Sequence, residues 1–112
     1  MNILRFLDIS TAHLTNGDVE LLDSGEDLPI DNMAYDYGWI VSTATLMDEE
    51  TRDEVVTELR AAGFSEAFIA AAIAAGRNEC WLLRFEADAD VEESLPVGGY
   101  DGIKRCRQTP FP

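Results

Sequence analysis

The segment from Ser65 to Gly76 places the tightest constraint on how this chain folds. The ten residues between them read Glu-Ala-Phe-Ile-Ala-Ala-Ala-Ile-Ala-Ala, and Ser and Gly are residues that typically begin and end helices. We therefore expect a helix over residues 66–75, capped by Ser65 and closed by Gly76. A helix that is apolar on nearly every side either lies in the centre of a core or gives one side to a partner. Burial is the favoured interpretation, so other elements must surround this helix.

Three other segments have the patterns of strands. Residues 2–9 mix β-branched and large apolar residues, residues 35–42 alternate with an aromatic face, and residues 80–86 form an apolar run. The polar, acidic segment 26–32 contains a proline and predicts a surface loop.

Two more helices are expected from their terminal signals. Thr15 or Asn16 can cap a short helix that ends at Ser24 and Gly25. Thr45 and Asp48 resemble a helix-start box, which predicts a helix over residues 48–62 with Gly63 after it. The sequence thus predicts one acidic α+β domain over residues 1–112, in which a small antiparallel or mixed sheet of three to four strands packs against two or three helices. A basic tail occupies residues 103–112, and we keep open whether it is flexible.

The charge of the chain limits its partners. It holds 22 acidic and 8 basic residues, a formal net charge of −14. Such a surface is repelled by phosphate and by anionic membranes and attracted to basic surfaces, including those that hold nucleic acid. We therefore expect no direct nucleic-acid or membrane partner, with solubility as the simpler explanation of the acidity.

The cysteines and the amino terminus indicate where the chain works. Cys80 and Cys106 suffice for neither a disulfide framework nor a metal cage, and Cys80 lies in an apolar run where a buried thiol is the ordinary outcome. The first residues lack the pattern of a leader peptide, and no run is long enough for a membrane span. We expect a reducing, cytoplasmic location.

No motif predicts a catalytic, cofactor or metal site. His13 follows Ser10 and Thr11, but a lone histidine between a strand and a helix cap more often fixes a turn than serves as a base. Residues 88–93 lack the central Gly and distal Glu of a calcium loop, which leaves weak divalent binding as a minor alternative. The Gly-rich residues 98–102 lack the Lys-Ser or Lys-Thr of a phosphate loop and predict a turn. We expect no enzyme and no cofactor.

The acidic surface itself is the remaining candidate. Glu50, Glu54 and Glu58 recur every four residues and would form one ridge on the expected helix, with neighbours about 6 Å apart. Like charges at this spacing lower the stability of a helix by a few tenths of a kcal/mol per pair. The spacing is also of the same order as the distance between neighbouring phosphates along a nucleic-acid strand. The residues that we expect to bind a partner are all acidic: Glu50, Asp53, Glu54, Glu58, Glu26, Asp27, Asp31 and Asp36.

Two strings in the first 42 residues carry a resemblance. Phe6–Thr15 (FLDISTAHLT) and Tyr35–Trp39 (YDYGW) resemble an uncharacterised family, a domain of unknown function, of small acidic proteins from bacterial mobile elements, phages and plasmids. The resemblance implies a context, because small acidic proteins of such elements often occupy the nucleic-acid channel of a restriction or CRISPR complex. It implies the host cytoplasm as the location if the element is a phage.

Three functions follow as hypotheses. The first is an anti-CRISPR or antirestriction inhibitor that binds the basic, nucleic-acid-binding surface of a host defence complex through the acidic residues, as a nucleic-acid mimic. The second is a non-catalytic interaction module or homodimer that works through the Ala-rich helix or through Tyr35, Tyr37 and Trp39. The third, an enzyme using His13 and Ser10, is the least favoured.

Overall fold

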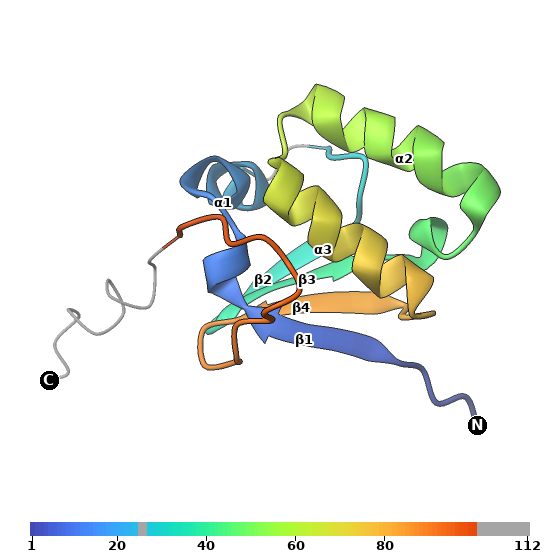
Figure 1. Cartoon of the computed structure of the whole chain (residues 1–112), viewed down its shortest axis with the longest axis horizontal. Coiled ribbons are helices and arrows are strands. Elements are labelled where there is room, and N and C mark those ends of the chain that lie inside the picture. Colours follow the sequence, from blue (N-terminus) through green and yellow to red (C-terminus); the bar gives the residue numbers. More distant parts are fainter. Residues whose placement is uncertain (25–26, 101–112) are drawn as a thin grey trace, which may run out of the picture.

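A four-stranded mixed sheet covered by helices on one face forms the fold (Figure 1). The computed structural model describes residues 1–24 and 27–100. Its elements in chain order are β1 (Phe6–Ser10), η1 (Thr11–His13), α1 (Asn16–Asp23), β2 (Asn32–Tyr35), β3 (Gly38–Ser42), η2 (Ala44–Leu46), α2 (Glu49–Ala62), α3 (Glu66–Arg77) and β4 (Leu82–Glu86). The strand order is β1-β4-β3-β2, with β1 parallel to β4 and the other pairs antiparallel. The predicted α+β class is confirmed. Glu26, Cys106 and the expected basic tail lie outside the described residues.

The Ala-rich helix α3 lies between α2 and the sheet (Figure 1). Its side chains Phe68, Ile69, Ala71, Ala72 and Ala75 are buried, as the sequence analysis favoured. The helix continues to Arg77 and does not end at Gly76 as expected. This glycine lies inside the helix, where it allows close packing against η2. A Cβ atom at Gly76 would collide with the backbone of Leu46 in η2.

The prediction of one continuous strand over residues 35–42 is wrong, because these residues belong to two strands and the turn between them. β2 ends at Tyr35, the chain turns through Asp36 and Tyr37, and β3 begins at Gly38. Gly38 pairs with Tyr35 on one side and Glu86 on the other, and a Cβ atom there would overlap the carbonyl of Phe85. Only glycine allows β3 to approach β4 this closely.

The other boundaries differ from expectation by a few residues. β1 spans Phe6–Ser10 and not residues 2–9, and β4 begins at Leu82 and not at residue 80. The Thr45 box does not form, because Thr45 belongs to η2 and the side chain of Asp48 caps α2 by accepting from the Glu50 amide. Gly63, at φ +105°, ends α2 as predicted. The buried Ile30 anchors the predicted surface loop in the core.

The carboxylate of Asp18 joins the first turns of α1 and α3. Asp18 and Thr15 form a reciprocal capping box at the start of α1, and Asp18 is also fully buried. Its Oδ2 accepts from the Thr15 amide at 2.9 Å and from the Ser65 hydroxyl at 2.6 Å, and its Oδ1 accepts from the Ser65 amide at 2.8 Å. One side chain therefore fixes the start of two helices that are far apart in sequence.

The segment after β4 returns to η1. The amides of Gly98 and Gly99 donate to the Ala12 carbonyl, and the amide of Tyr100 donates to the Leu14 carbonyl. This return places the Tyr100 ring 6.0 Å from the Trp39 ring, in an edge-to-face arrangement.

Candidate functional site: an acidic helix and an aromatic pocket

The solvent-facing side of α2 is acidic. The buried residues of α2 are Val55, Val56 and Leu59. The opposite side exposes four of the predicted partner-binding residues, namely Glu50, Asp53, Glu54 and Glu58. We call these four residues the α2 acidic face.

The two arginines of α2 do not neutralise this face. Arg52 donates from Nε to the Leu46 carbonyl at 2.8 Å, which ties its charge to η2. Arg60 forms a two-pronged ion pair with Glu66 at the start of α3, with both N–O distances 2.9 Å. This pairing raises the pKa of Arg60 and lowers that of Glu66, mainly through the hydrogen bonds. Within residues 1–24 and 27–100 the other ion pair joins Arg84 and Asp8 on the sheet, so the α2 acidic face has no cationic partner.

The remaining predicted residues lie elsewhere. Asp27 and Asp31 are exposed in the loop before β2, and Asp36 is exposed in the turn between β2 and β3. Glu26 lies outside the described residues. The structure therefore divides the predicted set among an outer helix, a loop and a hairpin turn.

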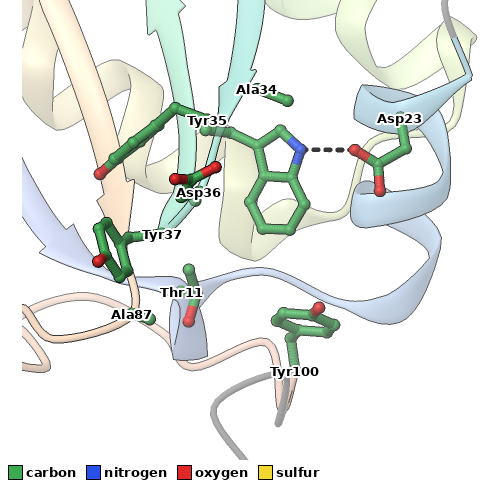
Figure 2. A pocket seen from close by; sticks show the side chains of 10 residues that line it. Thr11, Asp23, Ala34, Tyr35, Asp36, Tyr37, Ala87 and Tyr100 are labelled. Atoms are coloured by element: carbon green, nitrogen blue, oxygen red, sulfur yellow. Dashed lines mark hydrogen bonds between the residues drawn. The ribbon is translucent and has the colours of Figure 1, made fainter. Parts of the chain in front are cut away.

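Asp36 stands at a pocket that the sequence analysis did not predict (Figure 2). The hairpin, η1, α1 and the returning C-terminal segment enclose a cavity of about 240 Å³. Aromatic side chains dominate its lining, and two carboxylates complete it: Thr11, Asp23, Ala34, Tyr35, Asp36, Tyr37, Gly38, Trp39, Ala87 and Tyr100.

Two contacts hold the aromatic walls in place. The indole Nε1–H of Trp39 donates to Asp23 of α1 at 2.8 Å, the dashed bond in Figure 2. Tyr35 and Tyr37 meet edge to face at 6.4 Å, on the other side of the turn. Burial and then the charge of Glu86 raise the pKa of Tyr35, so its phenol stays neutral at physiological pH. The pocket is therefore a set of fixed aromatic rings with negative charge beside them.

Two hydroxyls of this lining, those of Thr11 and Tyr35, are buried without a hydrogen-bond partner among the described residues, and Thr11 is the more deeply buried residue. Thr11 is 2% exposed, and its Oγ1 has no hydrogen-bond partner among the described residues. Buried hydroxyls normally have a partner, since an unbonded one costs about 1–3 kcal/mol. Thr11 therefore places an unsatisfied hydroxyl beside the pocket.

His13 fixes a turn, in the way that the sequence analysis favoured. It is fully buried, and the amide of Glu92 donates to its Nε2 at 2.9 Å. Its Nδ1 must then carry the proton, which it donates to the Pro96 carbonyl at 2.8 Å. Ser10 is also engaged with the backbone, because its hydroxyl accepts from the Ala12 amide. Both nitrogens of the ring thus bind the returning C-terminal segment.

Neither a cluster of metal ligands nor a membrane-spanning helix is found in the part of the chain that the structure describes. No cluster of three or more potential His, Cys, Asp or Glu ligands is found there. None of the helices in the same residues is long and apolar enough to cross a membrane. Cys80, the free cysteine of this part, is buried as expected.

Sequence reasoning missed the pocket because its walls come from distant segments. Trp39, Thr11 and Tyr100 meet only because the hairpin and the C-terminal return place them together. The Asp36-Tyr37-Gly38 sequence was an available signal, because Asp and Gly are residues that favour tight turns between two strands.

Comparison with curated proteins and with solved structures gives no significant match. A family match covers residues 6–99, from the first residue of β1 to one residue before Tyr100. The matched family is described as a family of unknown function (DUF5983), C-terminal domain. Because the match spans most of the 112 residues, including the α2 acidic face and nearly all of the pocket, this chain belongs to that uncharacterised family.

Proposed function

We propose that this protein is an anti-defence inhibitor of a mobile element, of the anti-CRISPR or antirestriction type, that binds a basic surface of a host protein complex. The α2 acidic face is the contact surface, and the surface it occupies is one that otherwise holds nucleic acid. The observation that carries the proposal is that four exposed carboxylates share one helix face while both arginines of that helix bond elsewhere. The resemblance to proteins of mobile elements supplies the biological setting.

The physical case rests on charge and spacing. Glu50, Glu54 and Glu58 follow one another at intervals of one helical turn, so their mutual repulsion lowers the stability of the fold. An ion pair with a nearby arginine would have offset this repulsion. Their separation of about 6 Å is of the order of that between neighbouring phosphates. With a net charge of −14, long-range attraction would also speed the encounter with a basic partner.

A capture experiment tests this function. The full chain is immobilised and exposed to host lysate at low and at high salt, and the captured complex is identified and quantified. We expect binding to weaken steeply with salt, because exposed charges are screened beyond about 10 Å at 0.1 M salt. Glu50→Gln, Glu54→Gln and Glu58→Gln together should abolish capture and inhibition.

A matched variant separates the α2 acidic face from bulk charge. Glu20, Glu79 and Glu93 are also exposed and lie outside α2, so changing all three to Gln removes the same net charge. This variant should keep most of the binding. Equal loss in both variants, or binding that does not respond to salt, would contradict the proposal.

A homodimer is the second candidate, and one observation favours a particular surface for it. The Ala-rich helix uses its apolar side chains inside the core, and Trp39 is 8% exposed, so neither offers a large apolar surface. The sheet face opposite the helices instead exposes Phe6, Met33 and Leu82, at 50%, 58% and 41%. Light scattering after size exclusion should then give twice the chain mass, and Leu82→Lys should return the monomer mass. A monomer for the unchanged protein would eliminate this candidate.

A further inference from the structure

We propose that the aromatic pocket at the β2–β3 turn binds the guanidinium group of an arginine side chain on the partner. This inference rests on the proposed function in taking the partner surface to be basic. It adds a second contact, distinct from the α2 acidic face, that gives specificity to an otherwise long-range attraction.

The size of the cavity suits one side chain. Pockets that hold cofactors or drug-sized ligands measure about 300–1,000 Å³, and this one measures about 240 Å³. It is too small for a nucleotide and large enough for the end of an arginine. Its lining includes the exposed turn residues Asp36 and Tyr37, so a side chain that projects from another protein can reach it.

The lining selects for a cation. Among the described residues of the lining, Asp23 and Asp36 are charged and none is Lys or Arg. The faces of Trp and Tyr rings attract cations, by about 0.5–1 kcal/mol where exposed and about 2 kcal/mol where water is excluded. Figure 2 shows Tyr37 and Tyr100 on either side of Thr11, with Asp36 above, so rings and a carboxylate border the same space.

The buried hydroxyl supplies the third element of recognition. Thr11 lines the cavity, and its Oγ1 is buried and lacks a partner in the described part of the chain. A guanidinium group has five N–H donors in a fixed plane and no acceptor, so it can donate to a hydroxyl and a carboxylate at once. It also stacks on aromatic faces and is more weakly hydrated than an ammonium group, which favours arginine over lysine in an aromatic pocket.

The test uses a probe that needs no partner. N-acetyl-arginine amide is titrated into the full chain at constant ionic strength, and NMR follows the Trp39 indole N–H and the amides of the hairpin turn. We expect saturable shifts at Trp39 and Tyr37 in the millimolar range. N-acetyl-citrulline amide, which has the same shape without the charge, should cause no saturable shift, and the corresponding lysine probe should bind more weakly.

Two variants test the assigned groups. Asp36→Asn changes an exposed side chain, and Thr11→Val replaces a hydroxyl that has no protein partner among the described residues, so both should fold. Each should weaken the arginine probe by about tenfold, the effect of one lost hydrogen bond to a charged group. Unchanged binding in both variants would overturn the assignment.

Other outcomes are also decisive. The absence of a saturable shift at Trp39, or equal binding of the citrulline probe, refutes a cation pocket, and equal binding of the lysine probe refutes the choice of guanidinium. Arg105 and Arg107 of this chain carry the same group and Lys104 is a further cation, so the titration is repeated with all three changed to Gln. Much tighter probe binding in that variant would assign the pocket to the chain itself and not to a partner. The probe binds or fails to bind whether or not the α2 acidic face captures a host complex, so the two proposals fail separately.

Discussion

The substitution Asp18→Asn replaces one oxygen of a buried carboxylate by an NH₂ group. This carboxylate binds residues at the start of both α1 and α3. In the structure the carboxylate accepts three hydrogen bonds, from the amides of Thr15 and Ser65 and from the Ser65 hydroxyl. An Asn side chain can keep the oxygen that faces the Ser65 amide. Its NH₂ group then occupies the Oδ2 position, where it cannot accept from Thr15 or from the hydroxyl.

The magnitude follows from these bonds. Hydrogen bonds to a charged group contribute about 1.5–3 kcal/mol each, so losing two costs about 3–6 kcal/mol. Removing a buried charge also removes its desolvation penalty, which places the net effect near the lower end. We expect the free energy of unfolding to fall by about 3 kcal/mol, a large part of the 5–15 kcal/mol typical of a native protein.

Urea unfolding monitored by tryptophan fluorescence measures this loss, since Trp39 is buried in the native state. The midpoint should fall without a change in slope, and the melting temperature should fall by roughly 12 °C, at about 4 °C per kcal/mol for this size. Glu20→Gln makes the same chemical change at an exposed position of α1 and should cost less than about 0.5 kcal/mol. A loss below about 1 kcal/mol for Asp18→Asn would refute a joining role for this carboxylate.

Two further outcomes are expected. Changing Glu50, Glu54 and Glu58 to Gln removes two like-charge contacts and should raise the free energy of unfolding by about 0.5 kcal/mol at low salt. The gain should vanish at 1 M salt, because salt screens the repulsion. Urea titrations at both salt concentrations measure the difference. The pKa of Tyr35 is raised above its ordinary 10.0 by burial, so its contribution to stability is complete below pH 10 and is lost as pH rises through the folded-state pKa. Tyr35→Phe should remove that alkaline loss in pH-dependent melting.

Local signals predicted the helices well. Thr15 and Ser65 cap α1 and α3 as expected, and Gly63 ends α2, because a cap or a stop depends on residues within one turn. The central position of α3 was also predictable, since its composition leaves no polar side.

Features that depend on contacts between distant residues were not predictable. The alternation from Tyr35 to Val41 continues across the Asp36–Tyr37 turn, so periodicity alone could not reveal two strands. The bond from Asp18 to Ser65 joins residues 47 positions apart, which no local signal reveals. The pocket required the return that places Tyr100 against Trp39.

The pairing of β1 with β4 has a consequence for how the chain is made. Among the described strands β1 hydrogen-bonds to β4 alone, and its ion pair between Asp8 and Arg84 joins residues 76 positions apart. During synthesis on a ribosome, β1 therefore emerges first and stays without a neighbouring strand until β4 has been translated. The helices between them can form early, but the sheet can be completed only after β4 has been made. A topology with such distant pairing also folds more slowly than a helical bundle of equal length.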